Sequence, residues 1–171
     1  MRTNQNFGLF YFLLVICQVI MCNYTNLGPY VILTMLPAMV LCIPTGVNTA
    51  LCMLIAFASG ICVDWLSEGM LGLNAASLTA AGLLRKTFIR LFLGEDSISR
   101  NDSFSIRRNG IGKVSLAQAA SISVFLIIYI TLDGAGTRPF WFCLARFAAS
   151  LACCMPLGIM VTNILTPDDR K

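Results

Sequence analysis

The chain has 171 residues, of which 57% are hydrophobic and only 12% are charged, and it carries a net charge of +4. A soluble domain has about 25% charged residues, so this composition excludes an ordinary water-soluble fold. The apolar residues form long uncharged blocks that predict membrane-spanning helices and lack the roughly ten-residue alternation of a membrane β-barrel. We therefore expect an all-α polytopic membrane protein in which residues 1–171 form a single transmembrane domain.

Six apolar segments are expected to be transmembrane helices, at about residues 7–22, 30–43, 47–66, 71–84, 115–132 and 140–165. The first could be taken for a signal peptide, but it is long for one and no Ala-x-Ala type cleavage site follows it. The second is short for a full span and contains Pro37, which should kink it; a re-entrant segment is the alternative. Small residues recur in the third and fourth segments, so these two helices are expected to pack closely at the centre.

The segment 85–114 differs from the rest because it holds seven of the twelve basic residues. Its first part, with Arg85, Lys86 and Arg90, is basic and amphipathic and is expected to lie on a membrane surface of anionic lipid. Nucleic-acid binding is not expected, because the segment has few aromatic residues and adjoins a membrane. Six spans would place both termini and this basic loop on one side, and the positive-inside rule makes that side the cytoplasm.

Catalytic chemistry has little support in the sequence. The eight cysteines lie within or at the edge of apolar segments, histidine is absent, and no Cys-x-x-Cys pair occurs. We interpret the cysteines as packing residues rather than as metal ligands or redox centres. No phosphate-binding loop or nucleophile–base pair is present either. The sequence therefore predicts a protein that is not an enzyme, with no catalytic, cofactor or metal site.

Three charges near the ends of apolar segments need an explanation. Asp64 and Glu68 are one helical turn apart and could form a proton or cation site. The simpler interpretation places both at the outer membrane interface in contact with water, because Gly69 follows at once. Arg146 lies near the start of the last segment, where it could pair with Asp133 or Asp64, or extend its side chain to the outer surface.

The segment from position 60 to position 75 reads Gly-x-x-x-Asp-x-x-Ser-x-Gly-x-Leu-Gly-Leu-Asn-Ala and resembles the central motif of the bacterial rod shape-determining protein family MreD. The matching positions are Gly60, Asp64, Ser67, Gly69, Gly72, Asn74 and Ala75. That family has a small-residue helix ending in Asp, then a small-residue helix start and a basic cytoplasmic loop. Gln18-Val19 followed by Asn23, and Pro156 in the last segment, are similar to the family's first and final helices.

The resemblance implies a non-enzymatic, multi-pass protein of the bacterial inner membrane. It would be a scaffold subunit of the cell-elongation (rod) complex, supporting lateral peptidoglycan synthesis and cell shape. It would bind MreC directly and reach RodA, a penicillin-binding transpeptidase and the MreB filament through the complex. Its partner face would lie on the third and fourth helices, formed by Gly60, Gly69, Gly72, Ala75, Ala76 and Thr79.

An alternative follows from the same resemblance. The MreD bundle is similar to the substrate-binding subunits of energy-coupling-factor transporters, so the chain could instead capture a small, vitamin-type solute. Such a protein needs an outward pocket with convergent polar groups, which Asp64, Asn74 and Arg146 could supply. A membrane protein of another family is the third interpretation.

Overall fold

The structure is a computed structural model that describes residues 7–25, 31–68, 71–94, 110–134 and 138–165. Every regular secondary-structure element in this part of the chain is a helix. The elements are α1 (Phe7–Tyr24), α2 (Leu36–Cys42), α3 (Thr49–Val63), the π-helical turn η1 (Asp64–Glu68), α4 (Leu73–Leu93), α7 (Ile111–Gly134) and α8 (Phe140–Leu165).

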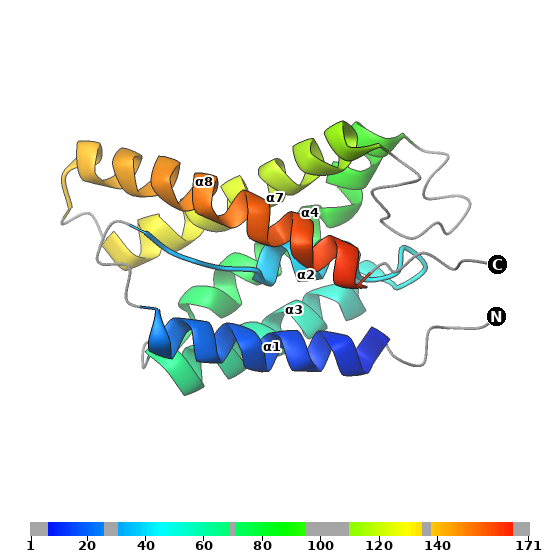
Figure 1. Ribbon diagram of the computed structural model, residues 1–171, viewed down its shortest axis with the longest axis horizontal. Coiled ribbons are helices and arrows are strands. Elements are labelled where there is room, and N and C mark those ends of the chain that lie inside the picture. The colour runs from blue at the N-terminus through cyan, green and yellow to red at the C-terminus, as the bar shows by residue number, and fades with distance from the viewer. Residues whose placement is uncertain (1–6, 26–30, 69–70, 95–109, 135–137, 166–171) are drawn as a thin grey trace.

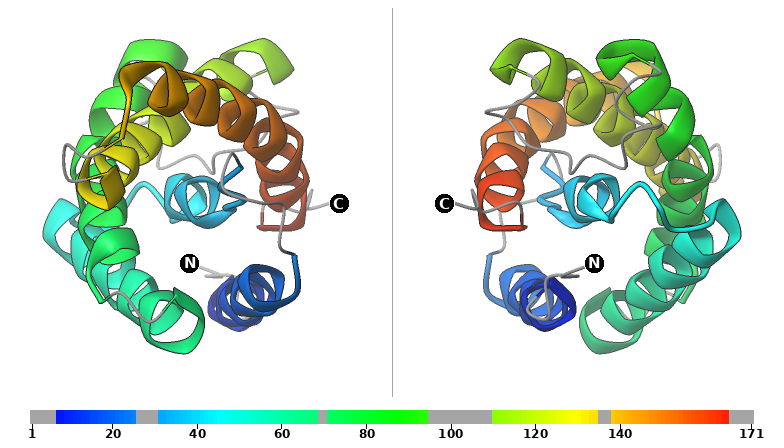
Figure 2. Two further views of the ribbon diagram at one scale, coloured as in Figure 1. Left: turned by 90° about the vertical axis from the view of Figure 1, so that its left-hand side faces the viewer. Right: turned by 90° about the vertical axis from the view of Figure 1, so that its right-hand side faces the viewer.

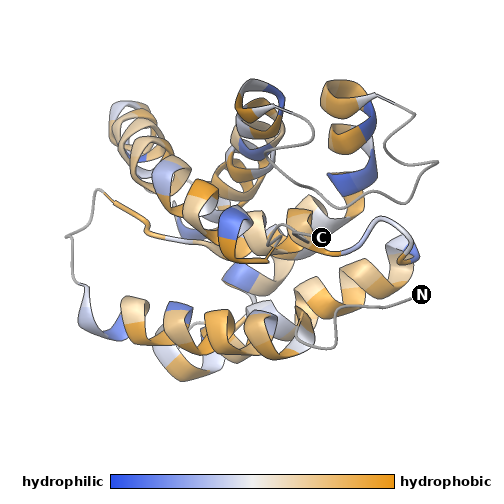
Figure 3. Ribbon diagram, turned by 45° about the vertical axis from the view of Figure 1, so that its right-hand side comes forward, coloured by the Kyte–Doolittle hydropathy of each residue, from blue (hydrophilic) through white to orange (hydrophobic). Residues whose placement is uncertain are grey.

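Four helical stretches in the described residues are long and apolar enough to cross a membrane: α1, residues 49–67, α7 and α8. Hydrophobic residues make up most of the long helices (Figure 3), and many large ones among them are exposed on the surface of the bundle. The all-helical fold expected from composition is therefore confirmed, and the four long apolar stretches support the expected membrane protein. α4 is 21 residues long but contains Arg85, Lys86 and Arg90, which lower its mean hydropathy.

The long helices surround the short helix α2 (Figure 2). All seven α2 residues are buried, and Leu36, Met39, Val40 and Leu41 have no exposed surface. The start of α1 and the end of α8 lie at one end of the bundle, with the end of α4 and the start of α7 (Figure 1). We call this the terminal end, and the other end the hairpin end. The cytoplasmic position of the terminal end stays a prediction from charge.

The second expected span is not one helix. Residues 31–35 are not helical and run as a stretched-out chain into α2 (Figure 1), and we call them the extended segment. α2 begins only at Leu36, after its N-cap Met35, and Pro37 lies in its first turn rather than in its middle. The expectation of a helix over 30–43 with a central kink was therefore wrong. Proline has no backbone N–H to donate, and the first turn of a helix is where that donor is not needed.

Side chains of two helices hold the extended segment 31–35. Gln18 of α1 donates to the carbonyl oxygen of Leu33 (3.1 Å) and accepts from the N–H of Met35 (2.8 Å). On the other side, Ser150 of α8 accepts from the N–H of Ile32 (2.8 Å). An extended backbone inside a membrane bundle is stable only when its polar groups are paired in this way.

α4 continues beyond its expected end at residue 84. It runs to Leu93, and α7 begins at Ile111 instead of 115. The predicted loop 85–114 was therefore too long, because no glycine or proline lies between position 84 and Gly94. Gly94 has a φ of +89°, a conformation that favours glycine and ends the helix.

The close packing expected between the third and fourth segments is confirmed as contact between α3 and α4. A Cβ atom on Gly60 would lie 2.5 Å from the Cα atom of Ala75, so only glycine fits at this position. Further along the same contact, a Cβ on Gly82 would lie 3.3 Å from the Cβ of Ala56. Small residues thus let the two backbones approach each other directly.

Candidate functional site

Asp64 joins α3 to α4. Its side chain has no exposed surface and accepts four hydrogen bonds. Oδ2 accepts from the N–H groups of Gly72 (2.9 Å) and Ala75 (3.2 Å). Oδ1 accepts from the N–H and from the Nδ2 amide of Asn74, both at 3.0 Å. The carboxylate therefore caps the N-terminus of α4 from eight or more residues away.

The local sequence explains why a remote residue takes this role. Gly72 precedes α4 at a φ of +108° and has no side chain that could cap the helix. The first backbone N–H groups of a helix have no partner within the helix, and the helix dipole favours a negative charge beside them. Asp64 supplies both the acceptors and the charge. The expected water-exposed position of Asp64 was therefore wrong.

The structure brings five motif residues together at this joint: Gly60, Asp64, Gly72, Asn74 and Ala75. Ser67 lies beside them, half-buried, and donates to the carbonyl oxygen of Val63 (2.6 Å). Gly69 and the side chain of Glu68 lie outside the described residues, so the expected Asp64–Glu68 site is only half described. The oxygens of Asp64 already accept four donors, which disfavours a proton or cation site there.

Arg85 has a similar task at another helix end. It was expected on the membrane surface, yet only 1% of it is exposed, so that prediction was wrong. Its Nε donates to the carbonyl oxygen of Leu41 (3.3 Å), and a terminal nitrogen donates to that of Ile43. These carbonyls lie at the C-terminus of α2, where orphan acceptors favour a cation. Lys86 is half-buried and Arg90 is exposed.

Arg146 pairs with Asp133, one of the two partners that the sequence predicted. The pair lies at the hairpin end, between α7 and α8, and its side chains are 12% and 16% exposed. Arg138 approaches the same Asp133 oxygen, with an N–O distance of 3.5 Å and 37% exposure. Asp64, the other expected partner, is occupied by the backbone of α4. Two arginines thus share one carboxylate.

An apolar groove of about 500 Å³ runs along the outer side of the α3–α4 contact. Met53 and Phe57 of α3 form one wall, and six residues around α4 form the other: Gly72, Ala75, Ala76, Thr79, Ala80 and Leu83. We call this the α3–α4 groove. Four positions of the expected partner face line it. Gly60 does not, because the backbone of Ala75 lies against it inside the bundle.

Buried polar residues on the other helices were not predicted as site residues. Gln18 and Ser150 hold the extended segment, and Gln118 and Ser121 of α7 are fully buried. A side chain at Gly158 of α8 would overlap the amide of Gln118, so this glycine makes room for it. Gln18 was detectable as the one strongly polar residue inside its apolar segment, but its partners were not.

The geometry thus contains two capped helix ends, one shared ion pair and one groove of small residues. The part of the chain that the structure describes has no group of three or more metal-ligating His, Cys, Asp or Glu residues. Comparisons of the chain with protein-family models, with curated proteins and with solved structures found no match.

Proposed function

We propose that the chain is a non-enzymatic scaffold subunit of the MreD type in a bacterial inner membrane. In this proposal it binds a transmembrane helix of MreC in the α3–α4 groove. Through MreC it would join RodA, a penicillin-binding transpeptidase and the MreB filament in the complex that elongates the cell.

The α3–α4 groove is the observation that carries this proposal. Membrane helices associate through close van der Waals contact, which requires small residues on at least one side. Five of the six residues on the α4 side of the groove are small, namely Gly72, Ala75, Ala76, Thr79 and Ala80; only Leu83 is large. A partner helix lying there would meet the backbone of α4 with little side chain in between.

The joint beneath the groove supports the same proposal. Asp64 holds the start of α4 against α3, and the missing side chain of Gly60 lets the two helix backbones come into contact. A surface that is rigid before binding costs less conformational entropy when the partner arrives. The motif that resembles MreD would then act by shaping a docking surface rather than by chemistry.

The membrane topology belongs to the proposal as well. We infer six membrane crossings. Four are the long apolar stretches α1, 49–67, α7 and α8, and the fifth is α4. The sixth is the extended segment 31–35 together with α2, which the other helices shield from lipid. Both termini would face the cytoplasm. Lys86 and Arg90, near the end of α4 at that side, would contact anionic lipid.

The test is an affinity purification of the tagged chain from its native membrane in mild detergent. We expect MreC in near-equal amount with the wild-type chain. Ala76→Leu, which places a large side chain in the groove, should reduce the MreC recovered at least about tenfold, since lost helix packing of about 1.4 kcal/mol has this effect. Ala152→Leu on the exposed side of α8 is the matched control and should leave recovery unchanged.

Two outcomes would contradict the proposal. MreC could be missing from the wild-type sample, or Ala76→Leu and Ala152→Leu could recover equal amounts of it. Ala76 is a better position for this test than Gly72, because the φ of +108° at Gly72 would strain any other residue.

The solute-capture alternative receives less support from the geometry. Asp64 and Asn74 bind each other and the backbone of α4, and Arg146 binds Asp133. The three residues expected to line a polar pocket are therefore used in two separate structural contacts. Recovery of an energising ATPase pair with a membrane coupling subunit, in place of MreC, would favour solute uptake instead.

A further inference from the structure

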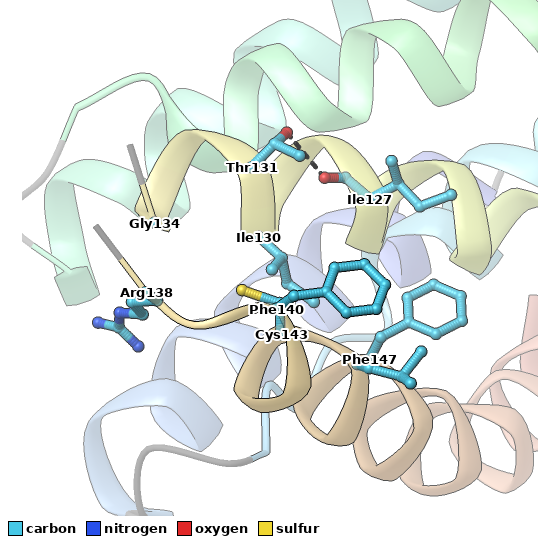
Figure 4. Close-up of a pocket in the computed structure, with 9 residues that line it drawn as sticks. Ile127, Ile130, Thr131, Gly134, Arg138, Phe140, Cys143 and Phe147 are labelled. Atoms are coloured by element: carbon cyan, nitrogen blue, oxygen red, sulfur yellow. Dashed lines mark hydrogen bonds between the residues drawn. The ribbon is translucent and has the colours of Figure 1, made fainter. Parts of the chain in front are cut away.

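A second apolar groove lies at the hairpin end, between the end of α7 and the start of α8. Its volume is about 610 Å³, within the range of about 300–1,000 Å³ usual for ligand pockets. Its residues are Ile127, Ile130, Thr131 and Gly134 of α7, then Arg138, Phe140, Cys143, Leu144 and Phe147 at the start of α8. We call this the α7–α8 groove (Figure 4).

The groove has a charged end and an apolar end. Arg138 lies next to Gly134, while the rings of Phe140 and Phe147 and the side chain of Ile127 lie further along the helices (Figure 4). From Gly134 to Ile127 the helix advances about 10 Å at ~1.5 Å per residue. This lining matches a ligand that has a polar head and an apolar body.

The charge at the mouth of the groove is positive. Arg138 and Arg146 both bind Oδ2 of Asp133, so one carboxylate faces two guanidinium groups. Arg146 is the more buried of the two and makes the closer contact. Arg138 is 37% exposed, and its guanidinium carbon lies 5.4 Å from the centre of the Phe142 ring, a cation–π contact. The cluster has a net charge of +1, and Arg138 retains donors that an anion can reach.

Exposed aromatic residues indicate the depth of this cluster in the membrane. Phe140 and Trp141 at the start of α8 are 75% and 77% exposed, and Trp65 in η1 at the same end is 76% exposed. Tryptophan concentrates at the level of the lipid headgroups, so Trp141 and Trp65 mark that level. Arg138 precedes Phe140 by two residues, so by this criterion Arg138 would lie at headgroup level, and Ile127 and Phe147, further along their helices, would lie at the level of the acyl chains.

We propose that the α7–α8 groove binds one anionic phospholipid, with the phosphate on Arg138 and an acyl chain between α7 and α8. The net positive charge selects the headgroup, and the apolar walls accommodate the chain. This site lies at the opposite end of the bundle from the basic residues Lys86 and Arg90, and it does not depend on the proposed scaffold function.

The test is native mass spectrometry of the full chain, released from micelles that contain equal amounts of phosphatidylglycerol and phosphatidylcholine. The wild-type chain should retain one phosphatidylglycerol, in preference to phosphatidylcholine by about fivefold, the selectivity that one basic residue near an anionic headgroup supplies. Arg138→Gln should abolish the preference, and Arg138→Lys should keep most of it. Lys113→Gln, which removes a cation from the terminal end of α7, should leave it unchanged.

Three results would overturn the proposal. The wild-type chain could retain both lipids equally, or Arg138→Gln could keep the full preference. Glycerol 3-phosphate, which has the anionic head without the chains, could displace the retained lipid at millimolar concentration, showing that the groove contributes nothing. Arg138 is exposed at the end of a helix and Arg146 still binds Asp133 in the variant, so Arg138→Gln is expected to fold.

Discussion

The two hairpins of the molecule, α3–α4 and α7–α8, each place an aspartate at the same end of the bundle (Figure 1). Asp64 is completely buried and binds backbone and side-chain N–H groups of α4, which closes its joint. Asp133 is 16% exposed and binds two arginine side chains, beside an open groove. An aspartate therefore fixes the joint of the α3–α4 hairpin, whereas at the α7–α8 hairpin an aspartate and its two arginines together carry a net charge of +1.

The difference follows from the backbone around each aspartate. At the α3–α4 joint, Gly60 lets the two helices touch, so the N-terminus of α4 comes within reach of Asp64. At the α7–α8 joint, large residues such as Phe140 and Phe147 line an open groove between the two helices. We infer that the first hairpin is built for stability and for presenting its outer groove, and the second for binding.

The largest expected effect is that of removing Asp64. Asp64→Ala leaves four buried donors of α4 without their acceptor and removes the cap, and it should cost about 3 kcal/mol of stability. Asp133→Ala should cost about 1 kcal/mol, because its arginines lie near the surface and can reach water. Thermal unfolding of both variants in detergent measures the difference. Equal losses would mean that the two joints do not differ as described.

A smaller effect is expected from a single methyl group at the α3–α4 contact. Gly60→Ala places a Cβ 2.5 Å from the Cα of Ala75, so the helices must separate, at a cost of about 2 kcal/mol. Gly8→Ala in α1 is the matched control, because nothing lies within 4 Å of its added Cβ. Gly8→Ala should be neutral or slightly stabilising. Thermal unfolding is again the measurement, and an unchanged midpoint for Gly60→Ala would contradict the close contact.

The smallest effects separate the two arginines at Asp133. Arg146→Ala should cost about 1 kcal/mol, since Arg146 is only 12% exposed and makes the closer contact. Arg138→Ala should cost less than about 0.5 kcal/mol, because an exposed pair is screened by water. A double-mutant cycle with Asp133→Ala measures each coupling separately. A larger coupling for Arg138 would show that it is a structural partner of Asp133 rather than a group available to a lipid.

Much of the architecture followed from the sequence alone. Long uncharged blocks predicted an all-helical membrane protein, because hydropathy and length are properties of each segment by itself. Small residues predicted that the third and fourth segments pack closely, and Gly60, Ala75 and Gly82 lie at that contact. Arg146 was expected either to reach the outer surface or to pair with Asp133 or Asp64, and it pairs with Asp133.

The roles of individual polar residues depended on tertiary structure. Asp64 was expected in water and Arg85 on a lipid surface, yet both are buried. Asp64 caps the start of α4, and Arg85, which belongs to α4, caps the end of α2. Hydropathy records the cost of burying a charge but not which backbone groups the fold will bring to it. The conformation of the extended segment 31–35 also depended on tertiary structure. Its apolar composition predicted a helical span, but Gln18 of α1 and Ser150 of α8 bind its backbone and allow it to remain non-helical.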